Sequence, residues 1–152
     1  MRIRAAEMAD VPTLVALMQA FYPESDFPLA AAPAAAFATL LADPRLGGVW
    51  LAEANGVAVG HAVLTLGFSM EYGGLRGFID DLSVRPAARG QGAGTMLLAA
   101  AREGAVARGI RALHVEVGLE NAVARRLYAR AGYADSGHLL LSLPLAAPVH
   151  AA

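Results

Sequence analysis

The chain has 152 residues, a net charge of −1 and a hydrophobic fraction of 57%. A chain of this length can form one domain that buries about two-thirds of the surface its unfolded form exposes. It contains no cysteine, which excludes thiol catalysis, a disulfide framework and a cysteine-based zinc site. It contains no lysine either, which excludes the phosphate-binding loop of nucleoside triphosphatases, and its scattered arginines argue against a nucleic-acid partner.

Neither a membrane span nor a secretory signal is indicated. Much of the hydrophobic fraction comes from alanine, as in residues 30–32 and 34–36, and no apolar run approaches the ~20 residues that span a bilayer. The N-terminus, residues 1–4 followed by Glu7 and Asp10, lacks the apolar core of a signal peptide. We therefore expect a soluble cytoplasmic protein.

The first half of the chain predicts a strand, two helices and a hairpin. Asp10 and Pro12 are suited to cap and open a helix. Asn55 and Gly56 lie between two apolar runs and form the strongest short hairpin signal. In chain order the expected segments are a strand at 1–5, a helix from Asp10, a substrate-side loop at 23–28, a helix at 33–42, and strands at 49–54 and 57–66.

The second half alternates strands and helices around a glycine-rich turn. After a turn at Gly73 and Gly74, the expected segments are a strand at 78–84, a loop at 89–94, a helix at 95–108, a strand at 112–117, a helix at 121–131 and a strand at 138–143. An antiparallel meander followed by a strand–helix–strand unit predicts an α/β domain with a mixed sheet and helices on both faces. No linker or internal repeat divides the chain.

Residues 89–94, Arg-Gly-Gln-Gly-Ala-Gly, are the most informative stretch because they join an apolar strand to a helix. Glycines let the backbone approach a bulky anion, and the helix N-terminus adds free N–H donors. Arg89 contributes a positive charge. The dinucleotide fingerprint fits poorly, since Thr95 stands where its third glycine belongs. The pattern predicts a diphosphate site, and the competing interpretation is a bare glycine-rich turn.

Residues 121–133, Asn-Ala-Val-Ala-Arg-Arg-Leu-Tyr-Ala-Arg-Ala-Gly-Tyr, form the second pattern. Asn121 suits a helix N-cap and Gly132 a C-terminal stop, while Leu127 and Tyr128 share one face. Taken alone, the pattern predicts a short amphipathic helix, and Tyr128 is more simply a packed core aromatic.

Together the two segments resemble the GNAT superfamily of acetyl-CoA-dependent N-acetyltransferases. Arg89, Gly92 and Gly94 match its Arg/Gln-x-x-Gly-x-Gly/Ala motif. Residues 121–133 match its Asn-x-x-Ala-x-x-Leu-Tyr-x-x-x-Gly-Phe/Tyr motif at the expected distance. The strong part of the resemblance covers about residues 78–133, and the pairing of the motifs is much more specific than either one.

The resemblance implies a fold, a cosubstrate and an assembly. The fold would be a single α/β GNAT-like domain over residues 1–145, with a mixed sheet of six to seven strands, an antiparallel N-terminal half and a splayed parallel pair at the cofactor site. Residues 146–152 would be a disordered tail. Acetyl-CoA would be the cosubstrate. Dimers are common in the family, and a C-terminal strand at 139–145 offers an edge that could pair or swap.

The resemblance also assigns contacts to the cofactor. The strand before the glycine loop would hold the pantetheine arm through its backbone, the loop would hold the diphosphate, and the start of the next motif would add a contact. The cofactor-binding residues implied in this way are Leu82, Ser83, Val84, Arg89, Gly90, Gln91, Gly92, Ala93, Gly94, Thr95 and Asn121.

Acetyl transfer to an amine requires a base, hydrogen-bond donors for an oxyanion, and a proton donor for the leaving group. A free alkylamine has a pKa of about 10, so a carboxylate or a water chain must take its proton. The oxygen of the tetrahedral intermediate needs donors, which the backbone N–H near Leu82 could supply. The departing thiolate needs a proton, and the resemblance places Tyr128 as its donor.

Two carboxylates are candidates for the base. The strand at 78–84 resembles the acidic strand of the diamine and polyamine branch, which makes Asp80 the base and leaves Asp81 to bind a cationic substrate or to face away. Residues 113–117 resemble the Leu-Glu-Val strand of ribosomal-protein N-terminal acetyltransferases, which makes Glu116 the base. We favour Asp80, and each carboxylate has plain surface as its simpler interpretation.

The acceptor pocket is the least patterned part of the chain. Glu71, Tyr72 and the 21–27 loop lie where the family's substrate walls are usually found, although a polar hairpin tip is the simpler interpretation. The predicted acceptor is a primary amine of a small molecule, polyamine-like or amino-acid-like. The alternatives are a peptide or protein N-terminus and a non-catalytic acyl-CoA-binding module. No metal is expected, because His61 and the other histidines lack partners at ligand spacing.

Overall fold

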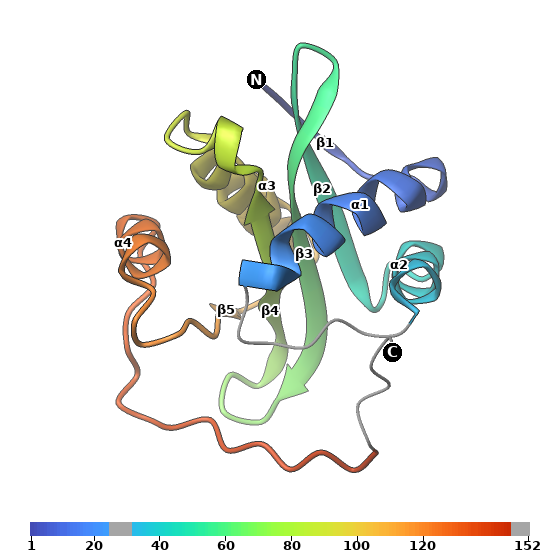
Figure 1. Ribbon diagram of the computed structural model, residues 1–152. Helices are drawn as coiled ribbons and strands as arrows, with labels where there is room; N and C mark the ends of the chain where they lie inside the picture. The colour runs from blue at the N-terminus through green and yellow to red at the C-terminus, as the bar shows by residue number, and fades with distance from the viewer. Residues whose placement is uncertain (25–31, 147–152) are drawn as a thin grey trace.

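In the computed structural model, residues 1–24 and 32–146 are described, and they form one mixed sheet between helices (Figure 1). The strand order is β1-β2-β3-β4-β5, with antiparallel pairs up to β4 and a parallel β4–β5 pair. The elements are β1 (Arg2–Ala5), η1 (Met8–Asp10), α1 (Val11–Phe21), η2 (Tyr22–Glu24), α2 (Pro33–Ala42), β2 (Gly47–Ala54), β3 (Val57–Ser69), β4 (Gly74–Val84), η3 (Pro86–Ala88), α3 (Ala93–Ala107), β5 (Ala112–His114) and α4 (Ala122–Arg130).

Proline and turn residues define several boundaries as predicted. α1 begins after Asp10 with Pro12 in its first turn, and α2 spans the predicted residues 33–42. The Asp10 side chain does not cap α1, because its carboxylate accepts instead from Arg4 and from the Glu7 N–H. Asn55 and Gly56 adopt φ values of 52° and 76°, the left-handed pair that closes a tight hairpin between β2 and β3. The predicted hairpin and both N-terminal helices are confirmed.

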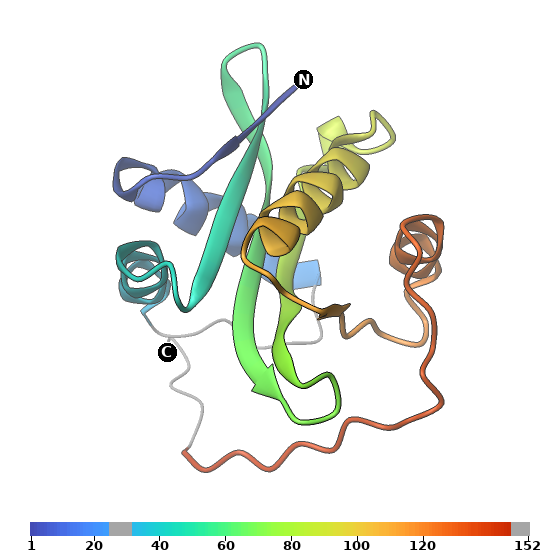
Figure 2. The same ribbon diagram turned by 180° about the vertical axis from the view of Figure 1, so that it is seen from behind.

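Helices cover both faces of the sheet, as Figures 1 and 2 show from opposite sides. One core cluster packs α1 and α2 against the sheet, and its buried residues are Leu14, Leu17, Phe37, Val49, Leu51 and Val63. Another packs α3 and α4 against the other face, and its buried residues are Leu64, Ile79, Leu98, Ala101, Ala105 and Tyr128. None of the helices in the described ranges is long and apolar enough to cross a membrane.

The expected six to seven strands are not found, because the described residues form five. No strand forms at 138–143. Residues 134–146 are exposed throughout and run past the end of the sheet without lying along it (Figures 1 and 2). Alternating leucines predict a strand, but a strand also needs a neighbour for its backbone groups. The strand predicted at 112–117 likewise ends at His114, where its pairing with β4 ends.

Two predictions fall partly on residues outside the described ranges. Residues 25–28 of the predicted substrate-side loop and residues 147–152 of the predicted tail lie among those left out. The mixed sheet, its antiparallel first half and the parallel β4–β5 pair are confirmed.

Candidate active site

β4 changes its pairing part-way along its length. Residues 76–78 lie between β3 on one side and residues 112–114 of β5 on the other. Beyond Phe78 the pairing with β5 ends, while pairing with β3 continues to Val84. The second half of β4 therefore presents backbone N–H and C=O groups along an edge that an extended ligand could bind.

Asp80 is the extra residue of a β-bulge. Val63 of β3 lies opposite Asp81, and the next residue, Leu64, lies opposite Ile79, so the ladder skips Asp80. A bulge bends a strand and re-aims its side chains, and bulges are over-represented next to active sites. This one lies where β4 loses its parallel partner.

The glycine-rich loop follows β4 and leads into α3. Gly90 and Gly92 have φ values of 75° and 87°, and no atom lies within 4 Å of the position where a Cβ would stand at either residue. Gly92 is the N-cap of α3, whose first N–H groups have no intrahelical acceptors. The Nε of Arg89 donates to the Val84 carbonyl at 3.0 Å, which ties the loop to the end of β4. A row of main-chain donors at the positive end of a helix suits a diphosphate.

Two further residues predicted to contact the cofactor have local roles in the structure. The Gln91 Nε2 donates to the Ala87 carbonyl at 3.2 Å, which closes the start of the loop. The Asn121 Oδ1 accepts from the Ala124 N–H at 3.0 Å, which confirms its capping role at the start of α4. The amide nitrogen of Asn121 is the part of that side chain left for a cofactor contact.

Tyr128 lies on α4 and is 8% exposed, packed in the core cluster beneath α3. Its ring meets that of Tyr133 edge-on, with centroids 5.7 Å apart. Burial, followed by the influence of Tyr133 and Asp81, raises the pKa of Tyr128 to about 12. The phenol therefore keeps its proton at neutral pH and can donate it.

His61 on β3 links two residues of β4 in a buried hydrogen-bonded chain. Its Nε2 lies 3.1 Å from Oδ2 of Asp81, and its Nδ1 lies 2.9 Å from Oγ of Ser83. Because an ionised carboxylate only accepts, Nε2 donates to Asp81, and Nδ1 accepts from the Ser83 hydroxyl. All three side chains are buried, with His61 completely so. The chain of hydrogen bonds fixes the orientation of the Asp81 carboxylate.

This buried chain is what the sequence analysis missed, since it gave His61 no role and Ser83 only a backbone contact. One signal was present: His61 and Ser83 face each other across the β3–β4 register. Period-two alternation also puts Asp81 and Ser83 on one face of the strand. In the described residues no group of three or more metal-ligating side chains is placed to hold an ion.

Asp80 and Asp81 have different electrostatic environments. The Asp80 residue is exposed, yet partial desolvation of its carboxyl by nearby atoms, and then the negative charge of Asp81, raise its pKa above the ordinary value of 3.8. Burial, followed by the two carboxylates, raises the pKa of Tyr22 at the end of α1 to about 12. An exposed carboxyl with a raised pKa is suited to accept a proton, and the neighbouring buried carboxyl is fixed by hydrogen bonds.

Two predicted substrate residues lie away from this centre. Glu71 and Tyr72 belong to the β3–β4 turn, and the strand between Gly74 and Asp80 spans about 20 Å. The Tyr72 ring packs instead near His114, with centroids 5.7 Å apart. Glu116 is exposed in the segment after β5, two residues past His114, and Asp80 likewise lies two residues past Phe78, the parallel partner of His114. The two candidate bases therefore occupy corresponding positions on the two strands just beyond the point where they separate.

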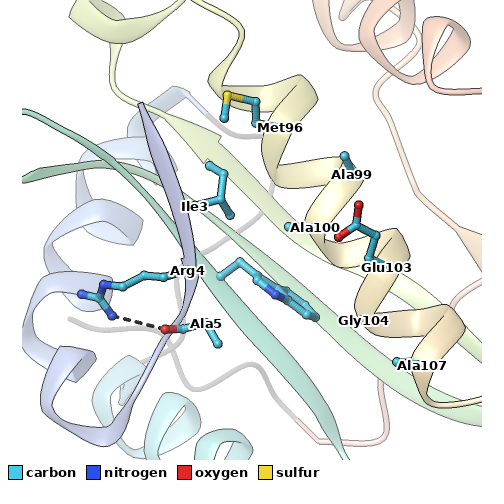
Figure 3. A pocket seen from close by; sticks show the side chains of 10 residues that line it. Ile3, Arg4, Ala5, Met96, Ala99, Ala100, Glu103, Gly104 and Ala107 are labelled. Carbon is cyan, nitrogen blue, oxygen red and sulfur yellow. Dashed lines mark hydrogen bonds between the residues drawn. The ribbon is translucent and has the colours of Figure 1, made fainter.

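A groove of about 590 Å³ lies elsewhere, between β1 and α3 (Figure 3). Figure 3 shows Ile3 on β1 opposite Met96 and Glu103 on α3. None of the predicted site residues lines this groove. Its end is closed by Trp50, which packs so tightly on Gly104 that a Cβ there would stand 2.3 Å from the indole. The groove lies apart from the bulge and the glycine loop.

Comparisons with known proteins agree with this geometry. A curated relative, the aminoalkylphosphonate N-acetyltransferase of Salmonella typhimurium, is 36% identical over 100 residues, which cover 66% of this chain and 64% of the relative. A solved integron cassette protein from the Cole Harbour salt marsh metagenome is 48% identical with a TM-score of 0.87, covering 97% of this chain and 93% of that one.

A third comparison shows the fold alone. The aminoglycoside N-acetyltransferase AAC(6')-Iy, solved in complex with coenzyme A, is 18% identical with a TM-score of 0.75, covering 95% of this chain and all of the other. The model of the Acetyltransferase (GNAT) family matches residues 12–133, which include the bulge, the glycine loop and α4. The chain belongs to the acetyltransferase (GNAT) family.

Proposed function

We propose that this chain is an acetyl-CoA-dependent N-acetyltransferase that acts on a primary amine of a small molecule by direct attack in a ternary complex. The observation that carries the proposal is the one-sided half of β4, where a bulged carboxylate, a glycine loop and a buried tyrosine adjoin one strand edge. Family membership and the coenzyme A complex of a structural relative support acetyl-CoA as the cosubstrate.

The cosubstrate would lie along the chain from the loop to the bulge. The N–H groups of residues 90–95 and the Arg89 guanidinium would bind its diphosphate. The unpaired edge of β4 at 82–84 would hold the pantetheine arm by backbone hydrogen bonds. This path ends beside Asp80, so the thioester would reach the bulge, where the strand changes direction.

Asp80 and Tyr128 then divide the proton transfers. Asp80 takes a proton from the ammonium form of the substrate, and the freed lone pair attacks the thioester carbon. A backbone N–H near Leu82 donates to the oxygen of the tetrahedral intermediate. The carbon–sulfur bond breaks and Tyr128 protonates the thiolate. The Tyr128 phenolate then takes the second proton that the nitrogen loses as it becomes an amide, so the products are an amide, coenzyme A and a protonated Asp80.

Asp81 would attract the amine. Its carboxylate is oriented by a hydrogen bond with His61, which is hydrogen-bonded in turn to Ser83. Two carboxylates side by side favour an acceptor that arrives as a cation, as diamines and polyamines do at neutral pH. The Salmonella relative, named for aminoalkylphosphonates, supports a small primary amine of another kind.

A coenzyme A release assay tests the proposal. Purified protein is given acetyl-CoA and a panel of diamines, polyamines, aminoalkylphosphonates, amino acids and peptides, and free thiol is measured over time. We expect turnover with at least one small amine. Tight binding of acetyl-CoA without turnover on any amine would instead identify a non-catalytic acyl-CoA-binding module. The cytoplasmic location and the homodimer stay predictions.

A further inference from the structure

An arginine on β4 lies on the same face of the sheet as the carboxylate that we propose attracts the amine. Ile79 packs in the α3 and α4 cluster, so period-two alternation turns Phe78 and Arg76 toward the face covered by α1 and α2 (Figure 1). Asp81 lies directly opposite Val63, which packs in the α1 and α2 cluster. Residues directly opposite each other in a sheet share a face. Arg76, Phe78 and Asp81 therefore point to one side.

Three rings, here named the aromatic shelf, lie beside Asp80 on this face. His114 points the same way as Phe78, because its neighbour Leu113 packs in the α3 and α4 cluster. The centroids of Phe78 and His114 are 5.2 Å apart, and those of His114 and Tyr72 are 5.7 Å apart. Phe78 and His114 are half-buried and Tyr72 is exposed, so one side of the shelf is open. Such rings suit the apolar chain of a small ligand.

Arg76 places a positive charge over the shelf. Its Cζ lies 5.4 Å from the centroid of the Phe78 ring, and within residues 1–24 and 32–146 its guanidinium has no hydrogen-bond or ion-pair partner. A guanidinium stacked on a ring keeps its N–H groups available at its edge, where they can bind an acid group in two parallel hydrogen bonds. The His114 Nε2 beside it is buried and also lacks a partner in the described part of the chain. Buried polar atoms are rarely left so, and the shelf therefore contains unused polar groups.

We propose that the acceptor is a small zwitterion, whose amine lies at Asp80 and Asp81, whose chain crosses the aromatic shelf and whose acid group pairs with Arg76. This inference rests on the proposed function and narrows its substrate class. Phe78, beneath the guanidinium, is two residues from Asp80, which is about 7 Å of strand. Two extended residues contain six backbone bonds, so an acceptor with about six bonds between its nitrogen and its acid oxygen fits this span. A diamine of that length would set a second cation against Arg76, which like-charge repulsion disfavours.

Three probes of equal length test the charge at the far end of the acceptor. 5-Aminopentanoate, 1-aminopentane and 1,5-diaminopentane share one amine and a five-carbon chain, and their other end is negative, neutral or positive. Calorimetry measures the binding of each to protein saturated with coenzyme A. We expect 5-aminopentanoate to bind at least tenfold more tightly than 1-aminopentane, and 1,5-diaminopentane to bind most weakly. Equal or tighter binding of the diamine, or no binding of 5-aminopentanoate, overturns the proposal.

Variants of Arg76 test whether this residue sets the order. Arg76→Gln should weaken binding of 5-aminopentanoate at least tenfold and leave 1-aminopentane unchanged, while Arg76→Glu should make the diamine the preferred probe. Arg76→Lys keeps the charge and should keep the wild-type order. The matched control is Arg108→Gln, because Arg108 also stacks on a ring, with its Cζ 5.8 Å from the Trp50 centroid, but on the α3 side of the sheet. A wild-type order in Arg76→Glu, or a lost order in Arg108→Gln, contradicts the assignment to Arg76.

Turnover separates failure of this inference from failure of the proposed function. Coenzyme A release is measured with the three probes and with the wider panel of amines. Release that is as fast with 1,5-diaminopentane as with 5-aminopentanoate overturns the zwitterion inference and leaves the acetyltransferase activity intact. No release with any amine overturns the proposed function, and the order of binding among the three probes still decides whether the site accepts a zwitterion.

Discussion

The two halves of β4 share one strand but differ in what surrounds them. From Gly74 to Phe78 the strand pairs with β3 on one side and, over three residues, with β5 on the other. Gly77 in this half packs against the side chains of Leu64 and Leu113. From Asp80 to Val84 it is bulged, paired on one side and flanked by buried polar side chains. The comparison indicates that backbone N–H and C=O groups stabilise the sheet where both sides of the strand are paired, and are available to a ligand where only one side is paired.

The largest effect is expected in the bulged half, from Asp80→Asn. Loss of a general base lowers kcat/KM by roughly 10²- to 10⁴-fold. Because desolvation and Asp81 raise the pKa of Asp80, the wild-type rate should rise with pH through a value above 3.8, and this limb should vanish in the variant. Steady-state rates across pH measure both. Glu116→Gln is the matched comparison, and a larger loss in that variant would make Glu116 the base instead of Asp80.

Tyr128→Phe should follow in size, lowering kcat by about 10²-fold with little change in the KM for acetyl-CoA, because only the leaving thiolate needs the phenol proton. Tyr133→Phe, on the neighbouring ring, is the control and should keep most activity. Single-turnover measurements separate the two parameters. Full activity in Tyr128→Phe would reduce this residue to a packed core aromatic.

In the enclosed half, Gly77→Ala should affect stability and leave chemistry alone. The new Cβ would stand 2.7 Å from the Cδ1 of Leu64 and 3.0 Å from the Cδ2 of Leu113. Overpacking of this kind costs about 1–3 kcal/mol of unfolding free energy. Urea denaturation measures the loss, and kcat of the folded variant should stay near wild type. A large fall in kcat without a fall in stability would contradict the assignment of a purely structural role to the Gly74–Phe78 half of β4.

The smallest effect is expected in the loop, from Gly92→Ala. A side chain at φ 87° costs about 1–2 kcal/mol, so the KM for acetyl-CoA should rise roughly tenfold if the loop must keep this conformation to bind. Gly109→Ala carries a similar penalty at φ 70° after α3 and is the control. It should lower stability by a similar amount without changing that KM. Equal effects of the two variants on the KM for acetyl-CoA would contradict a role of the loop conformation in cofactor binding.

Local signals predicted most of the framework. Asp10, Pro12, Asn55 and Gly56 act through their own backbone preferences, so the elements they bound were predictable. The glycine loop before α3 and the N-cap at Asn121 were predictable for the same reason. Each of these features depends on a few neighbouring residues.

Features that depend on distant pairing were not predicted. The bulge at Asp80 exists only in the register between β3 and β4, and the His61–Asp81 hydrogen bond joins residues twenty positions apart. The C-terminal strand was predicted wrongly because alternating leucines indicate a strand-like face without naming a partner. The site roles themselves stay predictions until they are measured.

The most direct test of the account is an amide-resolved NMR titration of the protein with coenzyme A. The largest backbone shifts should fall on residues 89–95 and on the unpaired edge of β4 at 82–84, where we propose that main-chain N–H groups bind the diphosphate and the pantetheine arm. Shifts that cluster instead on the β1–α3 groove around Ile3 and Glu103, or no shifts at saturating ligand, would contradict the account.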